Sequence, residues 1–68
     1  PDGPEDEQTA ARVAALVGDI RMAFRAGAKK AVVKESDEQI QKFVELLLEP
    51  EERSRVMWGG SSARHVIG

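Results

Sequence analysis

The residue types best suited to chemistry lie near the end of the chain, where Ser61 and Ser62 precede the one histidine, His65. A serine and a histidine three or four residues apart have the types of a nucleophile and its base. Catalysis also needs a group that orients the base and donors for an oxyanion, and the sequence around His65 supplies neither. Because cysteine and tyrosine are also missing, we expect no catalytic residues and a protein that is not an enzyme.

The Gly-Gly-Ser-Ser run at residues 59–62 has the composition of a phosphate-binding loop. It lacks the Gly-Lys-Ser/Thr ending of such loops and does not stand between a predicted strand and a predicted helix. A metal site is equally unsupported, because the chain has one histidine, no cysteine and no Asp-x-Asp-x-Asp-Gly loop. The sequence therefore predicts no cofactor and no metal.

Positive charge gathers on and after the first predicted helix. The residues concerned are Arg21, Arg25, Lys29, Lys30 and Lys34. If the helix continues across Gly27, they form a strip that could bind nucleic-acid phosphates, although a solvated or ion-paired face is the alternative. The chain has a net charge of −2, and its three aromatic residues are few for stacking bases. Nucleic-acid binding by an accessory domain is therefore the second hypothesis for function.

A helix-turn-helix drawn over residues 36–58 is disfavoured by its charge. Its second helix would present Glu51 and Glu52 to the DNA.

Charge also divides the chain into two halves. Residues 8–34 carry six basic side chains against one acidic, and residues 35–53 carry seven acidic against two basic. This polarity favours antiparallel pairing of the halves, within one chain or between two, although each exposed pair contributes at most about 1 kcal/mol.

Two long segments have the apolar period of a helix with one buried face. The first covers residues 8–26, with its stripe at Val13, Leu16, Val17, Ile20 and Phe24. Gly27 has the place of a left-handed C-cap. The second covers residues 37–48, with its stripe at Ile40, Phe43, Val44, Leu47 and Leu48. Ser36 and Gln39 form a capping-box pattern at its start.

The remaining segments have weaker signals. Residues 28–35 form a connector, for which an ordered helical turn over 28–32 is expected, although Val32 and Val33 tolerate a strand equally well. Pro50 ends the second helix and begins a third over residues 50–58, whose apolar residues are Val56, Met57 and Trp58.

These elements predict an all-α fold, a small three-helix bundle over residues 8–58 in which consecutive helices are antiparallel. We expect residues 1–7 to be a disordered acidic tail and residues 59–68 to be a flexible C-terminal tail.

A chain of this length buries only about 60% of its unfolded surface, and neither a disulfide nor a metal supplements its core. We therefore expect a protein-protein interaction or oligomerisation module, with a protein partner or a homo-oligomer such as a dimer, within a larger protein or assembly. The candidate partner-binding residues are Ala15, Gly18, Met22, Leu46, Met57 and Trp58. Alternatively, the alanines only raise helix propensity and Trp58 only covers the core.

Neither a signal peptide nor a membrane-spanning run is present, so a cytoplasmic location is expected. An amphipathic helix on a membrane surface is the third hypothesis, weakened because the charges of the first helix do not gather on one face.

Overall fold

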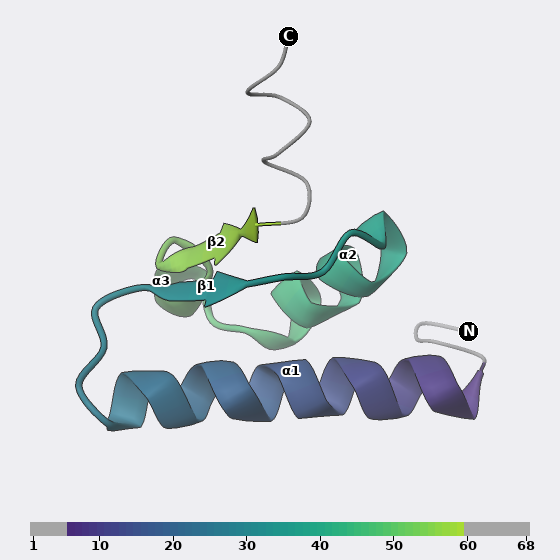
Figure 1. Ribbon diagram of the computed structural model, residues 1–68, viewed down its shortest axis with the longest axis horizontal. Coiled ribbons are helices and arrows are strands. Elements are labelled where there is room, and N and C mark those ends of the chain that lie inside the picture. The colour runs from purple at the N-terminus through teal and green to yellow at the C-terminus, as the bar shows by residue number, and fades with distance from the viewer. Residues whose placement is uncertain (1–5, 60–68) are drawn as a thin grey trace, which may run out of the picture.

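The computed structural model describes residues 6–59. Along this part of the chain the elements are α1 (Glu7–Arg25), β1 (Ala31–Val33), α2 (Glu38–Leu47), α3 (Pro50–Arg53) and β2 (Val56–Trp58) (Figure 1). Of the predicted tails at residues 1–7 and 59–68, only Asp6, Glu7 and Gly59 lie within the described residues. Asp6 and Glu7 are not disordered as predicted, because they form the N-cap and the first residue of α1. Ser61, Ser62 and His65 lie outside the described residues.

Helix α1 agrees with the prediction to within one residue at each end. Asp6 caps its start, and its Oδ1 accepts a hydrogen bond from the Gln8 amide at 3.3 Å. Gly27 follows the C-terminal end with a φ of +108°, a left-handed conformation that favours glycine. The predicted stripe faces the core, because its members are buried or, for Phe24, half-buried.

A two-stranded parallel sheet replaces part of the predicted bundle. β1 pairs with β2 in the register Ala31 with Val56, Val32 with Met57 and Val33 with Trp58. The all-α prediction is therefore wrong, and the chain is a mixed α and β fold. The helical turn expected over residues 28–32 is wrong, because β1 begins at Ala31. The third helix expected over residues 50–58 is too long, because α3 stops at Arg53 and β2 follows it. Valine and tryptophan suit a half-buried pleated surface, and pairing across the chain selects the strand for them.

Helices α1 and α2 run in the same general direction, so the predicted antiparallel arrangement of consecutive helices is also wrong (Figure 1). The reason is the length of the extended segment between them. Residues 28–35 span about 26 Å when extended, close to the length of about 28 Å of the 19-residue helix α1. The chain therefore returns to the start of α1 before α2 begins.

The second helix begins one residue later than its capping-box signal indicated. Asp37, not Ser36, is the N-cap, and its Oδ1 accepts hydrogen bonds from the amides of Gln39 at 2.9 Å and Ile40 at 3.4 Å. Pro50 occupies the first turn of α3, which confirms its predicted role at that junction.

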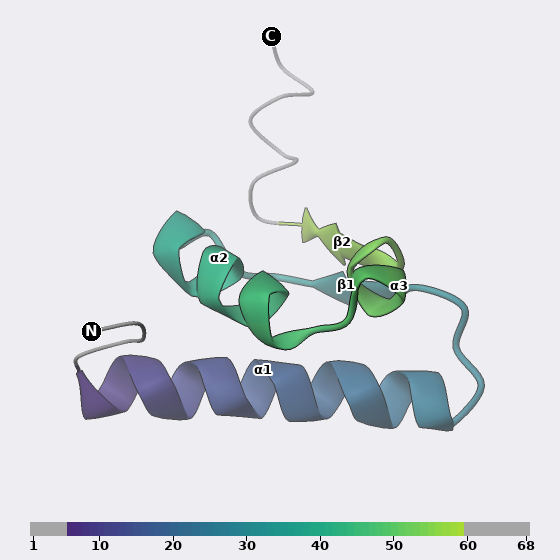
Figure 2. The same cartoon turned by 180° about the vertical axis from the view of Figure 1, so that it is seen from behind.

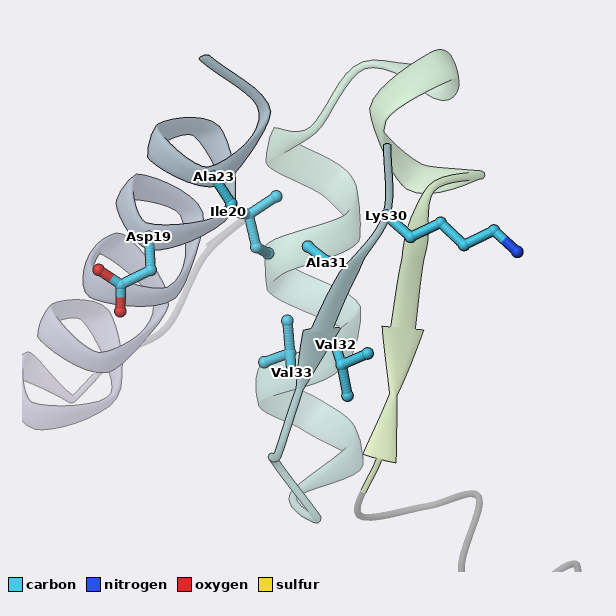
Figure 3. A pocket seen from close by; sticks show the side chains of 7 residues that line it. All are labelled: Asp19, Ile20, Ala23, Lys30, Ala31, Val32 and Val33. Carbon is cyan, nitrogen blue, oxygen red and sulfur yellow. The ribbon is translucent and has the colours of Figure 1, made fainter. Parts of the chain in front are cut away.

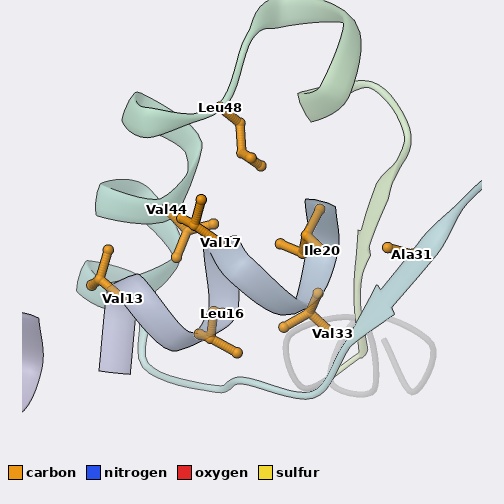
Figure 4. Close-up of a cluster of buried hydrophobic side chains, with 8 residues drawn as sticks. All are labelled: Val13, Leu16, Val17, Ile20, Ala31, Val33, Val44 and Leu48. Carbon is orange, nitrogen blue, oxygen red and sulfur yellow. The ribbon is translucent and has the colours of Figure 1, made fainter. Parts of the chain in front are cut away.

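Both long helices and the inner face of the sheet share one core (Figure 4). Its buried members are Val13, Leu16, Val17, Ile20, Ala31, Val33, Val44 and Leu48. Seen from behind, α2 lies above α1, and the segment that follows β1 passes behind α2 (Figure 2). Leu47 was predicted to join this core, but its side chain is 58% exposed. The main chain turns away from helical geometry at Leu48, which is buried in its place.

Candidate functional site

Strand β1 presents two different faces. Ala31 and Val33 are buried against the core, whereas Val32 between them is 64% exposed. Because side chains alternate along a strand, Lys30 and Lys34 share the outer face with Val32, and both are exposed. On the neighbouring strand Met57 is paired with Val32 and is 51% exposed. The outer face of the sheet therefore combines two uncovered apolar side chains with two lysines.

A groove runs along the side of β1 that faces α1, and we call it the edge groove. It has a volume of about 230 Å³ and is lined by Asp19, Ile20, Ala23, Lys30, Ala31, Val32 and Val33. Figure 3 shows β1 between α1 and β2, with Ile20 and Ala23 pointing from the helix toward the strand. The edge groove is bounded by a helix and by the edge of a strand.

The main chain of β1 has one hydrogen-bonding side toward β2 and one toward the edge groove. The Ala31 amide donates to the Arg55 carbonyl at 2.8 Å, so the peptide groups of Ala31 face β2. Consecutive residues of a strand direct their N–H and C=O groups to opposite sides, so those of Val32 point away from β2. In the described part of the chain the sheet has two strands, and β2 lies on the other side of β1, so no strand pairs with this edge.

Arg55 fixes the turn that leads into β1. Its Nη2 donates to the Ala28 carbonyl at 2.7 Å and its Nε to the Lys29 carbonyl at 2.9 Å. The guanidinium also lies over the ring of Phe24, 4.1 Å from its centroid. A residue after α3 thus ties the end of α1 to the start of β1. Sequence reasoning missed Arg55, because Phe24, Ala28 and Lys29 lie 26 or more residues away from it.

Two ion pairs set α1 against the acidic half of the chain. Arg12 Nε lies 2.9 Å from Glu35 Oε1, and Arg21 Nε lies 3.1 Å from Glu52 Oε2. Arg21 Nη2 also donates to the Leu47 carbonyl at 3.3 Å. These pairs join the basic half to the acidic half, but the antiparallel pairing expected from the charge pattern is wrong, because α1 and α2 run in the same general direction.

The Arg21–Glu52 pair also shifts the pKa of each of its two members. The hydrogen bond from Arg21 lowers the pKa of Glu52 below the ordinary glutamate value, and the Glu49 amide, which donates to Glu52 Oε1 at 2.8 Å, lowers it further. The hydrogen bond and the negative charge of Glu52 raise the pKa of Arg21. Both groups are therefore held in their charged forms.

The predicted basic strip is not one surface. Arg21 is engaged by Glu52, and α1 ends at Arg25. Lys29 lies in the turn after Gly27, and Lys30 and Lys34 lie on the extended segment around β1. The helical spacing that would align these charges is lost where Gly27 takes its left-handed conformation.

The candidate partner-binding residues are separated into four places. Ala15, Gly18 and Met22 are exposed on the side of α1 opposite its buried stripe. Leu46 is exposed on α2, and Met57 lies on the outer face of the sheet.

Trp58 packs against the core while its Nε1 donates to Glu45 at 3.1 Å. Of the six candidates, Met57 and Trp58 stand beside β1, and only Met57 lies on the outer face of the sheet. Sequence reasoning missed Val32 as an exposed residue, and its position between Lys30 and Lys34 was the available signal.

Within residues 6–59, no group of three or more His, Cys, Asp or Glu side chains is placed to hold a metal ion. The same residues contain no helix with the length and apolar character needed to span a bilayer. Comparisons with protein-family models, with curated proteins and with solved structures each found no match. The function is therefore inferred from the geometry of β1 and its edge groove.

Proposed function

We propose that this chain is a protein-interaction module that binds an extended segment of a partner protein along the free edge of β1. The observation that carries the proposal is the edge groove, into which the main-chain N–H and C=O groups of Val32 point. A segment lying there would continue the sheet by main-chain hydrogen bonds, and its side chains would contact the groove walls.

The type of sheet supports this proposal. Parallel sheets occur almost always with both faces covered, and two strands alone are marginally stable in water. Here the inner face packs on the core, whereas Val32 and Met57 leave apolar surface exposed on the outer face. An added strand would extend the ladder and cover part of this surface.

Nucleic-acid binding is less well supported. Arg21 is already paired with Glu52, and the remaining basic residues are divided between the end of α1, a turn and the residues on either side of β1. The described residues include two phenylalanines and Trp58, all of which pack against the core, so no ring is free to stack on a base.

A selection from a random peptide library, followed by amide hydrogen exchange on the full 68-residue chain, tests the proposal. In the free protein we expect the Val32 amide to exchange fast and the amides of Ala31 and Val33 to be protected by pairing with β2. A bound peptide should protect Val32 and leave the other two unchanged. Bound peptides that leave Val32 unprotected would overturn the proposal, as would a library that yields no binder.

Two substitutions at Val32 supply a matched pair of test and control. Val32→Pro removes an N–H that points away from β2, so the sheet should survive while peptide binding is lost. Val32→Thr keeps the N–H and the branched shape, and it should still bind. If Val32→Pro binds as well as Val32→Thr does, main-chain pairing at this edge is not the mode of binding.

We also propose that the chain forms a homo-oligomer and that it is located in the cytoplasm, as expected from the sequence. In the absence of a partner, the first is measured by sedimentation equilibrium.

A further inference from the structure

We infer that the segment bound by β1 carries two acidic residues four positions apart, with an apolar residue midway between them and small residues at the two remaining positions. This inference rests on the proposed function, because it names the chemistry of the partner at the same edge. It follows from which side chains of β1 would stand next to each residue of an added strand.

The outer face of β1 specifies the charges. Residues directly opposite on paired strands point their side chains to the same face. An added strand centred on Val32 would therefore place three of its side chains beside Lys30, Val32 and Lys34. No ion pair is found for either lysine in the described part of the chain, and both are exposed. Carboxylates beside the lysines and an aliphatic side chain beside Val32 complement this row.

The inner side of the edge groove specifies the small residues. The two intervening side chains of an added strand would point toward α1, where Ile20 and Ala23 form the wall. The volume of about 230 Å³ leaves little room there. An acidic residue at an inward position would lie against the apolar side chains of Ile20 and Ala23 and would lose solvation there. The acidic residues are therefore required at outward positions and disfavoured at inward ones.

A second copy of this chain is a poor occupant of the same edge. Two β1 strands paired antiparallel about Val32 would place Lys30 of each copy directly opposite Lys34 of the other. Like charges directly opposite destabilise a strand pair. The two lysines thus disfavour self-pairing and favour an acidic strand, which is how an edge separates right from wrong partners.

The experiment compares three versions of a library peptide that protects the Val32 amide. The centre of the first reads glutamate, alanine, valine, alanine, glutamate. The second has lysines in place of the glutamates. The third has the composition of the first with its glutamates moved next to the valine, where they point inward. At low salt we expect the first to bind about tenfold more tightly than each of the others, and added salt to reduce this difference.

Charge reversal in the protein provides the reciprocal test. The double variant Lys30→Glu, Lys34→Glu should bind the lysine peptide about tenfold more tightly than the glutamate peptide. Lys42→Glu removes an exposed positive charge from α2, and it should leave the original preference unchanged. The inference is supported if the preference between the two peptides inverts in the Lys30→Glu, Lys34→Glu variant and stays unchanged in the Lys42→Glu variant.

The outcomes separate the inference from the proposed function. If the three peptides protect Val32 with equal affinity, the edge binds a strand but does not select acidic residues, and the inference alone fails. If no peptide protects Val32, the proposed function fails as well. A single-stranded oligonucleotide that binds more tightly than the glutamate peptide, loses binding in the double variant and leaves Val32 unprotected would overturn both in favour of nucleic acid.

Discussion

The guanidinium of Arg55 lies over the ring of Phe24, with 4.1 Å between the guanidinium carbon and the ring centroid. The same group donates hydrogen bonds to the carbonyls of Ala28 and Lys29. One side chain thus connects the last turns of α1, the turn before β1 and the residue that precedes β2. The position of β1, and with it the edge groove, depends on Arg55.

Removal of this side chain should therefore lower the free energy of unfolding by more than an ordinary surface substitution does. We expect Arg55→Ala to lower the free energy of unfolding by about 2–3 kcal/mol, from the loss of charged hydrogen bonds and of the cation–π contact. Arg55→Lys should recover less than half of the loss, because an ammonium lacks the planar fork. Urea denaturation measures both. Arg25→Ala, at an exposed arginine of α1, is the control and should change stability by less than about 0.5 kcal/mol. Equal losses at the two positions would contradict the role given to Arg55.

The Arg21–Glu52 pair should make stability depend on pH in the acidic range. The folded pKa of Glu52 is lowered, by Arg21 first and then by the Glu49 amide. Its contribution is therefore complete above the ordinary glutamate pKa and is lost as the pH falls through the lowered folded pKa. The stability difference between the wild type and Glu52→Gln should be constant near neutral pH and should shrink in acid.

Urea denaturation over a pH series measures this difference. In an Arg21→Gln background most of the pH dependence of the Glu52 substitution should disappear. An unchanged pH dependence in that background would show that Arg21 is not the main cause.

Two glycines should respond to alanine in opposite directions. Gly18 lies in the interior of α1, and a Cβ added there would have no neighbour within 4 Å. Gly18→Ala should therefore stabilise the protein by about 1 kcal/mol through helix propensity. Gly27 has a φ of +108°, so Gly27→Ala should destabilise it by about 1 kcal/mol through backbone strain. Thermal denaturation compares the two variants, and a gain at both positions would show that the left-handed cap is not required.

A single charge reversal at Lys30, next to β1, should create a dimer. In Lys30→Glu, antiparallel pairing of two β1 strands about Val32 would set each new carboxylate opposite Lys34 of the other copy. We expect sedimentation equilibrium to show a dimer for this variant at concentrations where the wild type shows none through this edge. Adding Lys34→Glu should restore the wild-type mass, because carboxylates would then face each other. A monomeric single variant at the highest attainable concentration would contradict this geometry of the edge.

The two long helices were predictable from the sequence, and the sheet was not. Val13, Val17 and Ile20 recur at helical spacing, and Asp6 and Gly27 mark the ends of α1, so local signals define this helix well. Each strand has three residues, too few for an alternating pattern to stand out. Val56, Met57 and Trp58 follow a proline and two glutamates that start a helix, and local propensity extends that helix too far. Pairing with β1 overrides it.

The candidate site was predictable in part. The sequence indicated Met57 as a surface residue and noted Lys30 and Lys34 as available charges. It could not place them on one sheet, because their association depends on a parallel pairing between residues 31–33 and 56–58. Similarly, the spacing of Arg21 and Arg25 suggested a shared basic face, but the structure directs Arg21 to Glu52.

The parallel pairing of β1 with β2 also has a consequence for the order of folding. Its two strands are separated by α2 and α3, so they meet only after a loop of more than twenty residues has closed. The helical turns of α1 need no such closure. In pulse labelling during refolding, the Ala31 amide should gain protection later than the amides in the middle of α1. The edge that we assign to a partner would then become ordered after the helix that forms the opposite wall of its groove.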